Sequence, residues 1–139
     1  MTGHIVLNMA SLYFLGAPVL GLLGPTAFCG LYLASGVACS LSSLVFHRVF
    51  GRREHWASHG ASGAVYGTMA FLAAAQPHAR FLVFFVVPVP AWLCVAGLFT
   101  WDVANSFTPG QRAGGTDNAG HVGGILGGLL YFARLAGRI

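Results

Sequence analysis

A serine and a histidine lie at the starts of two apolar, glycine-rich segments of this chain. Ser62 is in Gly60-Ala61-Ser62-Gly63, and His121 is in Gly120-His121-Val122-Gly123-Gly124. A serine hydroxyl is a weak nucleophile unless a base lies within hydrogen-bond reach, and histidine is the commonest such base. The two residues therefore predict a serine-histidine catalytic pair. The simpler alternative, that Ser62 is only a small residue in a helix-packing surface, stays open at this point.

Small residues at regular spacing could bring the two segments together. Glycines four residues apart allow close approach of two helices in lipid. One such seam begins beside Ser62, and a longer one, with a second row next to it, begins beside His121. The seams are Gly63 and Gly67 in the first segment, and Gly120, Gly124 and Gly128 with Gly123 and Gly127 in the second. We therefore expect the two helices to dock along these glycines.

Three further polar residues are candidates to support the pair. His4 and Asn8 are four residues apart, so they share one face at the start of the first apolar segment. We interpret them as hydrogen-bond donors to an oxyanion beside the Ser62 amide, although a terminal His4 in the headgroup region is the alternative. Tyr66 follows Ser62 by one helical turn and is expected to pack against the His121 ring; an ordinary core tyrosine is the alternative.

No acidic residue stands out as a third catalytic member. Asp117 precedes His121 by four residues, but Thr116, Asp117 and Asn118 are all of types that favour a helix N-cap. We therefore expect a dyad. The other histidines have no convincing ligand spacing with an acid or a cysteine, so no metal site is expected; they are His47, His55, His59 and His78.

The composition is that of an integral membrane protein. Apolar residues make up 56% of the 139 residues and charged residues only 7%, with no lysine, whereas a soluble domain has about 25% charged residues. The formal net charge of +4 comes from arginines scattered between apolar runs. A nucleic-acid-binding protein would cluster such residues on one face, so that class is excluded.

Five apolar runs predict an all-α, polytopic transmembrane bundle with five spans. Backbone groups in lipid must be hydrogen-bonded internally, which favours helices over strands. The third run has 16 residues, about 24 Å of helix against a hydrocarbon core of about 30 Å, so Ser62 is expected to lie beneath the membrane surface. Pro88 and Pro90 are expected to kink the fourth helix. The runs are Ile5–Leu23, Thr26–Phe46, Ala61–Gln76, Phe81–Trp101 and Ala119–Leu135.

Together, these motifs resemble the rhomboid intramembrane serine proteases. The resemblance rests on Gly60-x-Ser62-Gly63, Tyr66, His121-x-Gly123-Gly124 and His4-x-x-x-Asn8, in the right order. It implies a Ser62–His121 dyad, an oxyanion hole of His4, Asn8 and the Ser62 amide, no cofactor, and transmembrane proteins as substrates. Thr100-Trp101-Asp102 and the proline-rich fourth run are more similar to the mitochondrial branch, which implies the mitochondrial inner membrane.

The sequence thus predicts one rhomboid-like domain over residues 1–139. The family has a six-helix core, so five spans imply that the first core helix and the loop after it are absent. The expected activity is that of a serine endopeptidase, with the fourth span and the Asp102–Asn118 segment as moving parts. Two rivals remain: an inactive rhomboid-like protein that binds membrane helices without cleaving them, and a small transporter or structural bundle.

Overall fold

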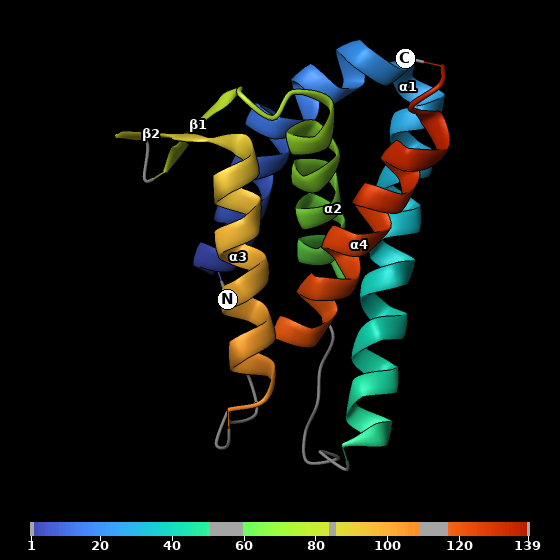
Figure 1. Cartoon of the computed structure of the whole chain (residues 1–139), viewed down its shortest axis with the longest axis vertical. Helices are drawn as coiled ribbons and strands as arrows, with labels where there is room; N and C mark the ends of the chain where they lie inside the picture. The colour runs from blue at the N-terminus through green and yellow to red at the C-terminus, as the bar shows by residue number, and fades with distance from the viewer. Residues whose placement is uncertain (1, 51–59, 84–85, 109–116, 139) are drawn as a thin grey trace.

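The computed structural model describes residues 2–50, 60–83, 86–108 and 117–138, which form four helices and one two-stranded sheet (Figure 1). Helix α1 is divided at Gly24 into a first arm (residues 2–23) and a second arm (residues 25–49). The first arm runs in the same direction as α2 and α4, and the second arm runs in the opposite direction, as α3 does. The starts of α2 and α4 and the end of α3 therefore lie at one end of the bundle. The elements are α1 (Thr2–Val49), α2 (Gly60–Ala75), β1 (Arg80–Val83), β2 (Val87–Pro90), α3 (Ala91–Ser106) and α4 (Asn118–Leu135).

Helix α1 contains the first two predicted spans, joined without a loop. Its 48 residues are interrupted at Gly24, whose φ of 76° and ψ of 167° are not helical. This backbone conformation is essentially restricted to glycine. Pro25 follows at once and lacks the backbone N–H that the start of a helix leaves unused. Gly24 and Pro25 thus turn one continuous helix into two antiparallel arms.

The second arm of α1 is apolar on its outer face and small or polar on its inner face. Ser35, Cys39 and Ser43 are fully buried on the inner face. Exposed apolar residues repeat every four positions on the outer face, at Leu33, Val37, Leu41 and Val45, each more than half exposed. This arrangement suits a surface in contact with lipid. By length and composition, α1 is the one helix among the described residues that could cross a membrane; Ala61–Ala75 is a shorter apolar helix.

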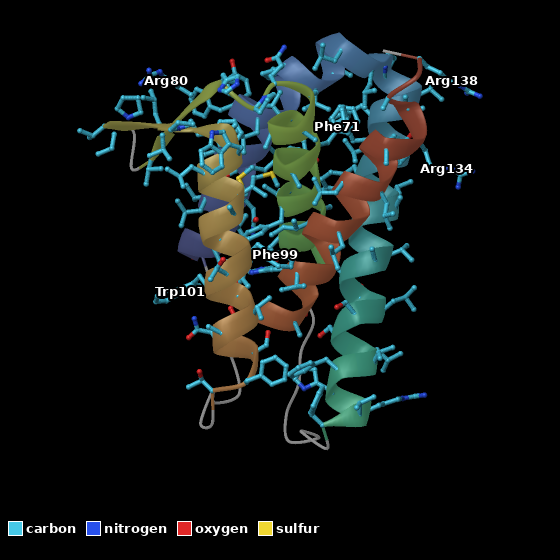
Figure 2. All side chains as sticks on the ribbon, in the orientation of Figure 1. Phe71, Arg80, Phe99, Trp101, Arg134 and Arg138 are labelled. Carbon is cyan, nitrogen blue, oxygen red and sulfur yellow. The ribbon has the colours of Figure 1, made fainter. Side chains whose placement is uncertain are left out.

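Helix α2 lies at the centre of the bundle and contacts α1, α3 and α4. It spans 16 residues and ends just before Pro77, which agrees with the predicted run. Phe71, on the α2 ribbon in Figure 2, is fully buried and packs edge-on against Phe132 of α4, with ring centroids 5.7 Å apart. Val19 and Leu31 from the two arms of α1 complete this side of the core.

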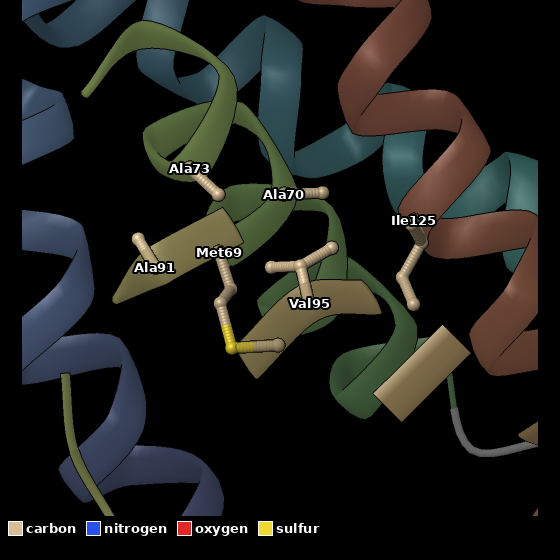
Figure 3. Packing of buried hydrophobic residues seen from close by; sticks show 6 residues of the cluster. All are labelled: Met69, Ala70, Ala73, Ala91, Val95 and Ile125. Carbon is tan, nitrogen blue, oxygen red and sulfur yellow. The ribbon is translucent and has the colours of Figure 1, made fainter. Parts of the chain in front are cut away.

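A second cluster joins α2 to α3 and α4. Its members are small or slender, so the helices pack closely, as Figure 3 shows. Burial of these residues fixes α3 and α4 against the central helix, as far as the end of α2 and the start of α3. The cluster consists of Met69, Ala70, Ala73, Ala91, Val95 and Ile125.

The prediction of a kinked helix over Phe81–Trp101 is wrong in its first half. Residues Arg80–Val83 and Val87–Pro90 pair as an antiparallel hairpin, with Leu82 opposite Pro88 and Arg80 opposite Pro90. Proline has no N–H to donate to a helix and disfavours helical conformation at the residue before it, so Val-Pro-Val-Pro is better accommodated as a strand. Helix α3 then begins at Ala91. The fold is mainly helical rather than entirely so.

Candidate active site

The structure brings Ser62 and His121 together. Ser62 is the third residue of α2 and His121 the fourth of α4, and both are buried, each with 4% of its surface exposed. The Ser62 hydroxyl lies 3.1 Å from Nε2 of His121. This is hydrogen-bond distance between a potential nucleophile and a potential base.

The glycine seams produce this juxtaposition. A Cβ placed on Gly124 would lie 2.9 Å from the carbonyl carbon of Gly63, and one on Gly128 would lie 2.7 Å from that of Gly67. The backbones of α2 and α4 are therefore in direct contact, beginning at the residues that follow Ser62 and His121 along each helix. The predicted docking surface is confirmed at Gly124 and Gly128. An added Cβ on Gly120 would instead meet Asp117 and Cys39, and the second row, Gly123 and Gly127, faces α1.

An acidic residue, Asp102 of α3, completes a line of polar groups. Its Oδ1 lies 3.4 Å from Nδ1 of His121, on the side of the ring opposite Ser62. Asp102 is only 2% exposed, whereas its neighbour Trp101 is 67% exposed and points away from the bundle (Figure 2). A role for this residue was not predicted from the sequence. The available signal was an acid at the end of an apolar run, since ionisable groups in membrane segments are usually functional.

The aromatic ring of Tyr66 covers one face of His121. The ring centroids are 4.1 Å apart and the planes are inclined by 18°, a stacked arrangement. The expected contact between these residues is therefore present. Stacking restricts rotation of the imidazole and keeps its two nitrogens directed at Ser62 and Asp102.

Asp117 is the N-cap of α4, as expected for one of the three candidate capping residues. Its Oδ1 accepts a hydrogen bond from the backbone N–H of Gly120 at 3.0 Å. The candidate therefore serves the helix start, while Asp102 contacts the histidine. Among the described residues, no group of three or more His, Cys, Asp or Glu side chains is arranged to hold a metal ion. His55, His59, Thr116 and residues 109–116 of the expected moving segment lie outside the described residues.

His4 and Asn8 form a pair on the first arm of α1. The Asn8 side-chain nitrogen lies 3.0 Å from the His4 carbonyl oxygen and 3.1 Å from His4 Nδ1. An amide nitrogen only donates, so Nδ1 of His4 accepts and its remaining proton is on Nε2. Asn8 therefore determines which ring nitrogen of His4 can donate. The first arm of α1 runs parallel to α2 and α4, so the starts of these three segments lie toward the same end of the bundle (Figure 1). His4 and Asn8, near the start of α1, therefore lie toward the same end as Ser62.

A mainly helical bundle with an apolar outer surface and a buried serine, histidine and aspartate has the features of a membrane protein with a buried polar site. Comparison with known sequences gives the family. A family model described as the rhomboid domain matches residues 2–138, and the chain belongs to the rhomboid family. It is thus a member of a family of helical membrane proteins.

Similar curated proteins come from mitochondria and from bacteria. Rhomboid protein 1, mitochondrial, of Saccharomyces cerevisiae is 35% identical over 92% of this chain and 36% of its own length. Presenilin-associated rhomboid-like protein A, mitochondrial, of Danio rerio is 32% identical over 92% of this chain and 33% of its own length. Rhomboid protease GluP of Bacillus subtilis is 29% identical over 95% of this chain and 23% of its own length.

The chain therefore spans about a third or less of the length of these relatives. No solved structure was found to match it.

Proposed function

We propose that this chain carries the catalytic core of a serine endopeptidase that cleaves transmembrane segments within the bilayer. The observation that carries the proposal is the 3.1 Å approach of the Ser62 hydroxyl to His121 Nε2 in a buried site. Family membership supports it, because a related protein is named a rhomboid protease. The elements α1 to α4 then provide the five predicted spans, with the two arms of α1 as two of them.

In the proposed reaction, Ser62 Oγ attacks the carbonyl carbon of a substrate peptide bond while His121 Nε2 takes the hydroxyl proton. The C–N bond of the tetrahedral intermediate then breaks, and His121 returns the proton to the leaving amine. Water attacks the resulting ester with His121 again acting as base, which releases the new carboxyl end and restores Ser62. No cofactor is needed in this sequence.

Asp102 makes this a three-residue arrangement rather than the expected dyad. An ionised Asp102 accepts a hydrogen bond from Nδ1–H of His121, which favours the tautomer with Nε2 unprotonated, as a base requires. The separation of 3.4 Å between Nδ1 and Oδ1 is long for a hydrogen bond. The carboxylate attracts His121 most strongly when the imidazole becomes positively charged during the reaction. Asp102 acts on the reaction through His121 and is therefore a positioning residue.

The developing oxyanion is assigned to the start of α2 and to the pair on α1. The Ser62 amide is in the first turn of α2, at the positive end of the helix dipole. His4 and Asn8 lie on the first arm of α1, and both N–H groups of the Asn8 amide bond His4. In this assignment His4 donates to the oxyanion from Nε2–H, together with the Ser62 amide, and Asn8 orients the His4 ring.

Labelling with a fluorophosphonate probe tests the proposal, because only an activated serine reacts. In liposomes, the parent protein should be labelled, Ser62→Ala should not, and His121→Ala should show almost no reaction. The exposed Ser40, which bonds the carbonyl of Gly36 on its own helix, provides the matched control Ser40→Ala. Absence of labelling in the parent, or equal labelling of Ser62→Ala, would refute the proposal.

Cleavage of single transmembrane segments in the same liposomes, detected by mass spectrometry, then separates a peptidase from its rival. An inactive rhomboid-like protein would still bind such segments but would release no fragments. Fragments that disappear with Ser62→Ala would establish the endopeptidase.

A further inference from the structure

The second arm of α1 contacts both helices that carry the candidate pair. On α2, Gly63 and Gly67 lie directly against the side chains of Cys39 and Ser35. On α4, Gly123 lies so close to the arm that an added Cβ would be 2.6 Å from the Ala38 carbonyl oxygen. One face of the second arm of α1 thus packs against both α2 and α4 and fixes their positions relative to each other.

Two adjacent serines on this arm hold the first turn of α4. Ser42 Oγ donates to the carbonyl oxygen of Ala119 at 2.8 Å. Ser43 Oγ donates to Oδ1 of Asp117, also at 2.8 Å. Both bonds cross more than 70 residues of sequence, and both reach the turn that carries His121. They are therefore tertiary contacts specific to this end of the bundle.

The Asp117 carboxylate links Ser43 of α1 to the backbone of α4. Its Oδ1 accepts from Ser43 and also from the backbone N–H of Gly120. The carbonyl of Asp117 accepts from the backbone N–H of His121 at 2.9 Å. Three hydrogen bonds therefore meet at Asp117, one from Ser43 of α1 and two from the backbone N–H groups of Gly120 and His121. A bond to a charged acceptor is a strong one.

We infer that Ser43 is a positioning residue, which acts through Asp117 to place His121 within reach of Ser62. This inference rests on the proposed function, because it assigns a role in the reaction of that site. Loss of the Ser43 hydroxyl would leave Asp117 held only by its own helix. Of the two serine contacts, only the bond from Ser42 to Ala119 would then hold the first turn of α4. That turn could pivot about this bond, and the separation of 3.1 Å between His121 and Ser62 would no longer be maintained.

A purely structural role for Ser43 makes a different prediction. The glycine seams and the hydrophobic clusters hold α4 over most of its length, so loss of one hydroxyl at its start should leave the bundle folded. If Ser43 served only to stabilise the bundle, Ser43→Ala would lower the melting temperature and leave the reaction of the folded fraction unchanged. If it positions His121, the reaction rate falls in protein that is fully folded.

The experiment compares Ser43→Ala with Ser40→Ala, the same change on the same helix but on a residue that bonds only within α1 among its described contacts. Fluorophosphonate labelling of the chain in liposomes gives the maximal inactivation rate and the probe concentration for half of that rate. We expect Ser43→Ala to lower the maximal rate about tenfold, because small displacements of reacting groups are costly. Half-saturation and melting temperature should match those of Ser40→Ala.

Two further variants keep the inference testable. Asp117→Ala should lower the rate at least as much, and the double variant should be no slower than Asp117→Ala alone, because Ser43 acts through Asp117. Ser43→Cys keeps a similar size with a weaker donor and should be slowed less than Ser43→Ala; it replaces that variant if the alanine protein is not recovered folded. Equal rates for Ser43→Ala and Ser40→Ala, or effects of Ser43→Ala and Asp117→Ala that multiply, would overturn the inference. An unlabelled parent would instead refute the proposed function.

Discussion

Replacing Gly124 by alanine should separate α2 from α4 and disable the site without unfolding the chain. The added Cβ would lie 2.9 Å from the carbonyl carbon of Gly63 and 3.0 Å from its Cα, and closer still to the carbonyl oxygen. All three atoms belong to the backbone, so no side chain can rotate out of the way. The helices themselves must move.

The size of this movement follows from the contact distances. Ordinary contacts of a Cβ begin near 3.4 Å, so the contact at 2.9 Å requires a separation of at least 0.5 Å, and the shorter one to oxygen requires about 1 Å. The distance from Ser62 Oγ to His121 Nε2 would then rise from 3.1 Å to about 3.6–4.1 Å, beyond hydrogen-bond range. A displacement of this size lowers a reaction rate by about 10- to 100-fold, and overpacking destabilises by about 1–3 kcal/mol.

The assay is the rate of fluorophosphonate labelling in liposomes, with the melting temperature of the same preparation. Gly97→Ala in α3 is the matched control, because no atom lies within 4 Å of the position that its Cβ would occupy. It should label at the parent rate and melt no lower. If Gly124→Ala labels as fast as Gly97→Ala, the two helices do not set the distance between serine and histidine, and the argument from the seam fails.

Three further tests concern the Asp102 carboxylate, the pair His4 and Asn8, and the bend at Gly24. Asp102→Asn should slow labelling about 100-fold, because the amide no longer favours the required tautomer of the imidazole. Thermal stability should not fall, since a buried charge is removed. Labelling at the parent rate would exclude a role for this carboxylate. Asn8→Ala should slow cleavage less than His4→Ala, and the double variant should match His4→Ala if the amide acts by orienting the imidazole; multiplying effects would show that each donates independently. Gly24→Ala should lower the melting temperature through about 1–3 kcal/mol of backbone strain. Gly21→Ala should not lower it, because Gly21 has open space around it and no positive φ. Equal melting temperatures for the two variants would show that the bend tolerates a side chain.

Local signals were sufficient to predict the pairing at the centre of the site. Glycine spacing indicated which faces of α2 and α4 meet, and a serine and a histidine at the ends of those faces had to come close. The local signal at Asp102, an acid at the end of an apolar run, does not say what the residue contacts. Asp102 lies on a third helix, and the rotation of that helix about its own axis determines whether the carboxylate faces the imidazole. That rotation depends on packing of Val95 and Ala91 against α2, which no local pattern specifies.

The hairpin was missed for a different reason. An uninterrupted apolar run has no period that separates a helix from a strand, and the preference for helices in lipid decided the prediction. Val86 and Val87 are β-branched and precede Pro88, which is the local evidence for an extended conformation. The residues just before the hairpin supply acceptors for the start of α3: the N–H of Ala91 donates to the Ala79 carbonyl at 2.7 Å, and that of Trp92 to the Pro77 carbonyl at 3.3 Å. Such a contact is visible only in the folded chain.

The difference in length between α1 and the other helices bears on how the protein enters a membrane. A helix of 16 residues such as α2 or α3 is about 24 Å long, shorter than the hydrocarbon core, and an aspartate within an isolated helix opposes insertion by about 2.5–3.5 kcal/mol. Helix α1 is longer and has no acidic residue, so it should insert into the membrane first. Its small, polar inner face would then be in place for the helices that follow to pack against. A chain ending after α1 should therefore resist carbonate extraction from membranes, whereas α3 expressed alone should be extracted. The residues proposed for catalysis would then meet only at the last step of assembly, when α4 is added.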